Sequence, residues 1–299
     1  MYANKKNYTN IFNLRNITLF FLITYFSVFV IYPIYKAFAG SFHDWNPLID
    51  QYDFIGLENF KNVLSNKLFW SSISNTFIFA FFSVIFRIII GLGLAMLLYS
   101  KLAKYKTFFR GMFYMPTITP LVAVSFVWMW LYNPQFGLIN KVFDLDINWL
   151  KDPNWALPAI IIMTIWKDFG YATVIFLGGL MGLPEEVYEA ADMDGANRWG
   201  LFRHITWPLL KPTTLFVVIT SLISYLQAYV QILIMTEGGP GTSTHVISYL
   251  IFDEAFVKYN FGVASAMAII LFVMIGILTL IMFKLTGENE GISKKKLKK

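Results

Sequence analysis

The chain contains no cysteine, few histidines and few charged residues, and each shortage excludes a class of function. Without cysteine there is no disulfide framework, no thiolate nucleophile and no cysteine-ligated zinc. The 3 histidines are His43, His204 and His245, which are far apart and lack ligand spacing, so we expect neither a metal nor a cofactor. Only 14% of the 299 residues are charged, whereas a soluble domain carries about 25%, which excludes a soluble globule.

Long apolar stretches are what the sequence has instead, since 57% of its residues are hydrophobic. A membrane-spanning helix needs about 20 mostly apolar residues. The sequence therefore predicts an all-α membrane bundle of six transmembrane helices, with kinks caused by Pro116, Pro120 and Pro158. The predicted spans are Ile17–Phe38, Ile73–Tyr99, Gly111–Tyr132, Trp155–Gly182, Pro212–Thr236 and Phe261–Leu285.

Lysine and arginine concentrate in the loops on one side of these spans. The positive-inside rule then places both the N and the C terminus in the cytoplasm. The basic run at 294–299 is expected to anchor the tail near anionic lipid rather than to bind nucleic acid. An alternative is that the first span is a cleaved signal peptide ending at Ala37-Phe38-Ala39, but its apolar run exceeds the usual 7–15 residues.

These features divide the chain into four parts. We expect a cytoplasmic tail at 1–16, the first transmembrane helix with an outer loop at 17–70, a transmembrane domain at 71–285 and a basic cytoplasmic tail at 286–299. The domain contains a distinctive cytoplasmic loop at 184–208.

This loop has the features of two short helices. Pro184 suits the first position of one helix, and Asp194 is predicted to be the N-cap of the next. Trp199, Phe202 and Ile205 would give the second helix an apolar face. Helices this short are marginal alone, so they need a surface on which to dock. The alternative is a helix lying along the membrane interface.

The loop also resembles the EAA loop of binding-protein-dependent ABC importer permeases, whose pattern is E-A-A, three residues, G, nine residues and I-x-L-P. Here Trp207 takes the place of the Leu, and the rest of the pattern is kept. The resemblance extends over about residues 70–285, and the turns near Asn133 and Gly238 look like those of the carbohydrate, maltose-permease-like branch. The matching positions are Glu189, Ala190, Ala191, Gly195, Ile205 and Pro208.

The resemblance implies a type I importer permease in which this loop carries the coupling helix, here around Asp194, Gly195 and Ala196. It implies several partners: an ABC ATPase dimer, a second homologous permease subunit and an extracytoplasmic solute-binding protein. The substrate would be a sugar crossing the cytoplasmic membrane. No G-x-x-x-x-G-K-[ST] phosphate loop occurs in the sequence, so we expect a non-catalytic subunit that relies on a separate ATPase.

Polar residues inside predicted spans are candidates for the transport pathway. Arg87, Lys167 and Asp168 are charged, and Asp168 either pairs with one of the two cations or lines the pathway. Two helical faces flanking the EAA loop coincide with the region where similar permeases hold substrate, although serine and threonine there also permit close helix packing. These candidates are Thr164, Asp168, Tyr171, Ser224, Tyr225, Gln227 and Ala228.

Other functions stay open at this point. Glycerol 3-phosphate is an alternative substrate for the same class of importer. A stand-alone secondary transporter would show inverted repeats, which the sequence lacks. A membrane enzyme would need converging acids, bases or metal ligands, and Asp168 is the only carboxylate in a predicted span.

Overall fold

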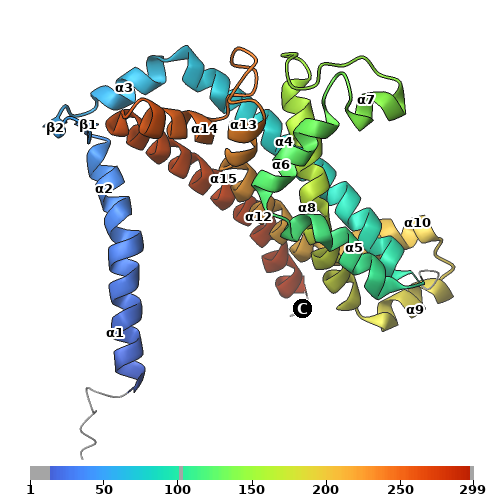
Figure 1. Ribbon diagram of the computed structural model, residues 1–299. Helices are drawn as coiled ribbons and strands as arrows, with labels where there is room; N and C mark the ends of the chain where they lie inside the picture. The colour runs from blue at the N-terminus through green and yellow to red at the C-terminus, as the bar shows by residue number, and fades with distance from the viewer. Residues whose placement is uncertain (1–13, 101–103, 297–299) are drawn as a thin grey trace, which may run out of the picture. The chain divides into compact units, whose positions relative to one another are not determined.

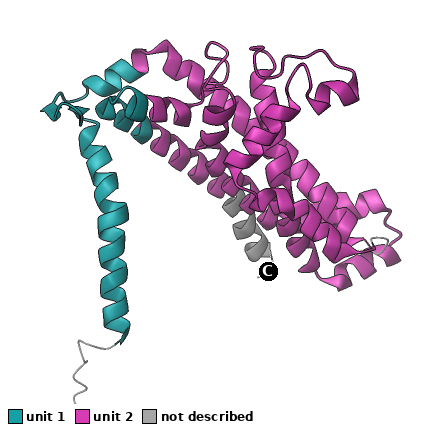
Figure 2. Ribbon diagram, viewed as in Figure 1, with its two compact units in different colours: residues 1–63, 254–269 teal, residues 64–253, 270–299 magenta. Residues whose placement is uncertain are grey.

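Apolar runs of more than 20 residues with few helix breakers form the long helices of the protein, as seen in a computed structural model that describes residues 14–100 and 104–296 (Figure 1). Side chains are described as far as Lys284. The predicted tail at 1–16 therefore lies largely outside the described residues, whereas the backbone of the predicted tail at 286–299 is described as far as Lys296. The chain divides into two compact units, residues 1–63 with 254–269 and residues 64–253 with 270–299 (Figure 2).

The first unit begins with an apolar helix, α1 (Leu14–Phe26), which continues through a π-helical turn (Ser27–Ile31) into α2 (Tyr32–Gly40). A hairpin of β1 (His43–Asn46) and β2 (Gln51–Phe54) follows, with His43 opposite Phe54 and Asn46 opposite Gln51. The all-α expectation is therefore wrong at this point, because residues 43–54 pair as strands. A short helix, α3 (Glu58–Ser65), follows the hairpin.

The second unit is a helical bundle built around α8 (Ala156–Met181), which packs against α4 (Lys67–Tyr99), α5 (Lys106–Ile118) and α12 (Lys211–Leu226). Small residues allow the close approach. A Cβ atom at Gly170 of α8 would overlap the carbonyl oxygen of Phe113 on α5. The largest buried side chains of this core include Phe79, Ile160, Met163 and Phe176.

Shorter helices connect the bundle helices. They are α6 (Leu121–Leu131), α7 (Leu138–Phe143), α9 (Glu185–Met193), α10 (Arg198–Leu201), α11 (Trp207–Leu209), α13 (Val230–Met235) and α14 (Ile247–Phe252). A π-helical turn at Phe202–Thr206 joins α10 to α11, and another at Asp253–Val257 follows α14. The last helix, α15 (Phe261–Lys296), contributes residues to both units.

Four helices among the described residues are long and apolar enough to cross a membrane, or up to six if each of two bent pairs is one span. Gly111–Tyr132, predicted as one span, is α5 and α6 bent by 94°, because Pro120 has no backbone N–H with which to continue the helix. The predicted kink at Pro158 is absent, since α8 is unbroken and Pro158 lies in its first turn, where proline is tolerated. The predicted span Pro212–Thr236 is interrupted, because α12 ends at Leu226 and α13 begins at Val230.

Candidate functional site

A polar cavity of about 280 Å³ lies between α8 and the break that separates α12 from α13. Polar side chains line most of it, although the surrounding helices are apolar. Its lining residues are Leu121, Thr164, Lys167, Asp168, Ser224, Tyr225, Gln227, Ala228, Tyr229, Val230 and Gln231.

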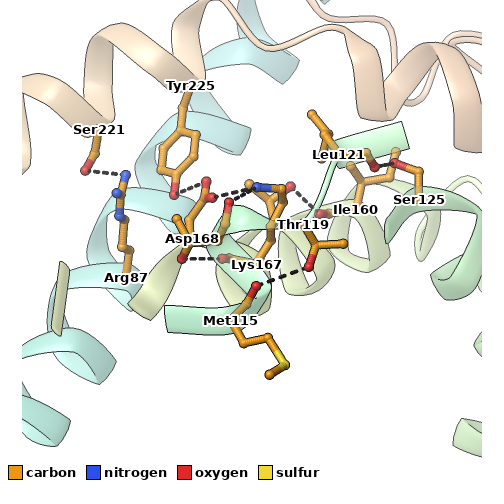
Figure 3. Close-up of polar contacts among 12 residues, drawn as sticks. Arg87, Met115, Thr119, Leu121, Ser125, Ile160, Lys167, Asp168, Ser221 and Tyr225 are labelled. Carbon is orange, nitrogen blue, oxygen red and sulfur yellow. Dashed lines mark hydrogen bonds and ion pairs between the residues drawn. The ribbon is translucent and has the colours of Figure 1, made fainter. Parts of the chain in front are cut away.

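An ion pair and a phenol fix the carboxylate at this cavity (Figure 3). The Lys167 ammonium lies 3.8 Å from Oδ1 of Asp168, and the Tyr225 hydroxyl donates to Oδ2 across 3.2 Å. The ammonium also donates to the carbonyl oxygen of Thr117 across 3.1 Å. Asp168 therefore pairs with Lys167, which is one of the two pairings that the sequence left open. The carboxylate keeps lone pairs with which to accept hydroxyl donors.

Arg87 on α4 lies behind this cavity and is not one of its lining residues. Its guanidinium donates to the hydroxyl of Ser221 on α12 across 3.0 Å (Figure 3). The guanidinium carbon is 5.0 Å from the ring centre of Tyr171 and 5.6 Å from that of Tyr225. Two aromatic faces and a hydroxyl thus hold this buried cation without a carboxylate partner in the described part of the chain.

The structure brings together every residue predicted for the substrate pathway except Tyr171, which contacts Arg87 instead. Sequence reasoning missed Tyr229, Val230 and Gln231, because it treated 212–236 as a single helix. The helix break turns the start of α13 into the cavity. No short motif marks this break in the sequence.

The EAA loop folds as two helices joined at a glycine. Helix α9 ends at Met193, and Gly195 adopts φ +74°, a left-handed conformation that favours glycine. The amide of Ala196 then donates to the carbonyl oxygen of Ala191 across 3.0 Å, which closes the turn. The sequence prediction of Asp194 as N-cap is wrong. Asn197 caps α10, because its side chain accepts a hydrogen bond from Gly200 N at 2.7 Å.

Most of this loop is exposed. Helices α9 and α10 contain no buried residue, and Met193 and Trp199 are 89% and 65% exposed. Of the EAA positions, Glu189, Ala190, Gly195 and Pro208 are exposed, whereas Ala191 and Ile205 are half-buried. The Tyr188 hydroxyl shares a hydrogen bond of 2.9 Å with that of Thr206 and so ties α9 to the following π-helical turn. An exposed helix pair anchored at one end is a surface on which a partner can dock.

The predicted apolar face of the second helix is only partly formed. The rings of Trp199 and Phe202 lie 5.6 Å apart, and both line a groove against α4, but Ile205 does not line it. The π-helical turn at Phe202–Thr206 interrupts the helical spacing on which that face depended.

Comparison with known proteins identifies the family of this chain. Residues 87–287 match the family described as the binding-protein-dependent transport system inner membrane component. The chain belongs to this family. The predicted resemblance to ABC importer permeases is thereby confirmed, together with the permease function and a place among inner-membrane components. The permeases of this family are non-catalytic membrane subunits.

Two relatives of this permease are similar over most of their length. A probable ABC transporter permease protein of Pyrococcus horikoshii is 35% identical over 253 residues, which are 83% of this chain and 86% of the relative. The trehalose/maltose transport system permease protein MalF of Thermococcus litoralis is 35% identical over 270 residues, 88% of this chain and 90% of the relative.

A solved structure gives the fold of the permease. It is the crystal structure of a bacterial ABC transporter involved in the import of the acidic polysaccharide alginate. One chain of it superposes with a TM-score of 0.81 over 92% of this permease and 95% of that chain. Its sequence is 23% identical, so this likeness describes the fold alone. The type I importer permease fold is confirmed.

Proposed function

We propose that this permease forms one half of the pathway by which a sugar enters the cell across the cytoplasmic membrane. A second homologous permease subunit would complete the pathway, an extracytoplasmic solute-binding protein would deliver the sugar, and a separate ATPase dimer would drive transport. Family membership and a relative named for trehalose and maltose support this proposal.

The observation that carries the sugar assignment is the cavity between α8 and α12. Its hydroxyl, amide and carboxylate groups complement the hydroxyls of a sugar, and the exposed ring of Tyr229 complements the apolar face of a pyranose. Thr164 is left out of this set, because its hydroxyl donates to the carbonyl oxygen of Ile160 in its own helix across 2.8 Å, whereas the Tyr225 hydroxyl donates to Asp168 at the cavity. The sugar contacts are therefore assigned to Asp168, Ser224, Tyr225 and Gln227, with Ala228 leaving room.

The exposed cytoplasmic loop is assigned to the ATPase. Its two short helices have no buried face in the described chain, and Met193 and Trp199 present apolar surface that a partner would bury. A rigid turn at Gly195 sets the angle between the helices. The proposed coupling surface consists of the EAA positions and the two residues beside Gly195. These residues are Glu189, Ala190, Ala191, Asp194, Gly195, Ala196, Ile205 and Pro208.

Six spans with both termini in the cytoplasm complete the proposal. The two bent helix pairs then contribute one span each, which brings the four long helices to six. In the second pair, the crossing helix is α12, and α10 stays in the loop. An even number of spans agrees with the concentration of lysine and arginine on one side. The chain has no cysteine, so a single cysteine at Gln135 or at Arg198 would report its side of the membrane through an impermeant maleimide. We expect labelling from outside only at position 135.

The deciding experiment is affinity purification of the tagged permease from its native host in mild detergent. Wild type is expected to recover an ATPase and a second permease. Met193→Glu, which places a charge on the most exposed apolar side chain of the loop, is expected to lose the ATPase and keep the second permease. The matched control is Val142→Glu on α7, an equally radical change at a side chain that is 71% exposed and outside the loop.

Uptake measured with the same variants completes the test. Met193→Glu should abolish uptake of the host's sugar at wild-type abundance, whereas Val142→Glu should preserve it. If wild type purified alone and still supported uptake, the importer assembly would be wrong and a stand-alone transporter would replace it.

A further inference from the structure

The charge of the sugar is left open by the comparisons, because one relative is named for trehalose and maltose whereas a solved one belongs to an importer of an acidic polysaccharide. We propose that Asp168 makes the cavity of this permease selective for uncharged sugars and excludes sugars that carry a carboxylate or a phosphate. This inference rests on the proposed function and specifies its substrate class. It concerns the half of the pathway that this chain provides.

The first step of the argument is that the cation at the cavity is already committed. Lys167 lies 3.8 Å from the carboxylate of Asp168 and 3.1 Å from the carbonyl oxygen of Thr117. Its side chain is 12% exposed, against 23% for Asp168. The negative end of the pair is therefore the more accessible one. An incoming anion would have to displace Asp168 from Lys167 while it is repelled by that same carboxylate.

The second step is that the other nearby cation is out of reach. Arg87 is 6% exposed, does not line the cavity, and lies against the rings of Tyr171 and Tyr225. Tyr225 contacts both charged residues, because its hydroxyl donates a hydrogen bond to Asp168 while its ring packs against the Arg87 guanidinium. To bind an anionic ligand, Arg87 would have to give up both rings and Ser221.

The third step is that the rest of the lining is uncharged. Beyond Lys167 and Asp168, the cavity is lined by hydroxyl, amide, phenol and aliphatic side chains. A carboxylate accepts hydrogen bonds and donates none, so it selects ligands that offer donors. The hydroxyls of a neutral sugar meet this requirement, whereas glycerol 3-phosphate brings a charge whose only cationic partner in the lining is already paired. Electrostatics therefore favours the sugar over the phosphate ester.

The absence of cysteine from the chain allows a direct measurement of this charge selectivity. Ser224→Cys puts the only thiol of the chain at an exposed position in the cavity lining. The complete importer carrying this variant is treated with two thiosulfonate reagents of similar size, one neutral and one bearing a sulfonate. Labelling of this chain is followed by mass spectrometry. Gln135→Cys, at an exposed outer turn, gives the rate ratio of the reagents away from Asp168.

We expect the anionic reagent to react several-fold more slowly than the neutral one with the thiol at position 224, after division by the ratio at position 135. Adding Asp168→Asn leaves Lys167 unpaired and should raise the anionic rate by about tenfold, since one unit of charge at short range in a partly screened site is worth about that factor. Adding Lys167→Gln should lower the anionic rate further. Both changes also alter the thiolate fraction at position 224, which affects the two reagents equally, so each anionic rate is divided by the neutral rate at the same position. No rate at position 135 should change.

Two outcomes keep this inference apart from the proposed function. Equal rates for both reagents at position 224, unchanged by Asp168→Asn, would overturn the charge selectivity even in an importer that still takes up its sugar. Slow anionic labelling at position 224, together with no sugar uptake by the wild-type complex, would uphold the selectivity of the cavity and overturn the function. A variant that misfolds is recognised because its abundance falls and its rates at position 135 change as well.

Discussion

The cavity and the cytoplasmic loop differ in how their functional residues are held. At the cavity, Asp168 is fixed by Lys167 and Tyr225, and the helices that carry these residues pack in the bundle. In the loop, α9 and α10 bury no residue, and the described contacts of the pair are mainly local turns, caps and the Tyr188–Thr206 hydrogen bond. The polar groups of the cavity are therefore held by contacts within this chain, whereas the loop presents a surface that the proposed ATPase would cover.

The largest effect should come from the two glycines that define these regions. Gly170→Val forces a branched side chain against the backbone of α5, so we expect almost no folded permease to be recovered. Gly195→Val meets no neighbouring atom but strains a left-handed residue, so the bundle should survive and the ATPase should be lost on purification. Size-exclusion chromatography and co-purification measure the two outcomes. A Gly195→Val variant as poorly folded as Gly170→Val would contradict the separation of the two regions.

A smaller effect is expected for the two tyrosines that contact Arg87. Tyr225 also donates a hydrogen bond to Asp168 at the cavity, whereas Tyr171 does not line the cavity. Tyr225→Phe removes a hydrogen bond to a carboxylate, so the apparent KM for sugar uptake should rise about tenfold. Tyr171→Phe keeps the ring face that contacts Arg87 and should change uptake less than about twofold. Uptake kinetics at matched abundance check both. The assignment of Tyr225 to the sugar fails if the two variants behave alike.

The smallest effect tests the cap inside the loop. Asn197→Ala should destabilise α10 by about 1 kcal/mol, because it removes the acceptor of the Gly200 amide. Asp194→Ala, at the end of α9, should change little, since its side chain does not cap α10. Hydrogen exchange at the Gly200 amide measures the difference. Faster exchange in Asp194→Ala than in Asn197→Ala would restore the cap predicted from the sequence.

Part of the molecule could be predicted because local chemistry decides it. Apolar runs specify the long helices α1–α2, α4, α8 and α15. The EAA spacing locates the loop along the chain, and this location does not depend on how the helices pack. Prediction was wrong where a local rule had competing solutions. Asp194 and Asn197 are both good N-caps, and the choice between them depends on the left-handed turn at Gly195. The hairpin at 43–54 was missed because its strands have only four residues each.

By itself, the sequence determined that this protein is a membrane permease with an EAA-type loop, because hydropathy and motif spacing are properties of contiguous residues. Only the tertiary structure decided that Asp168 pairs with Lys167, that Arg87 lies behind Tyr225, and that 229–231 enter the cavity. These relations join α4, α8, α12 and α13, most of which are far apart in the chain. A charged side chain in an apolar bundle needs polar or aromatic partners, and helix packing decides which residues are close enough to be those partners. Packing depends on several segments at once, so no single segment of the sequence predicts it.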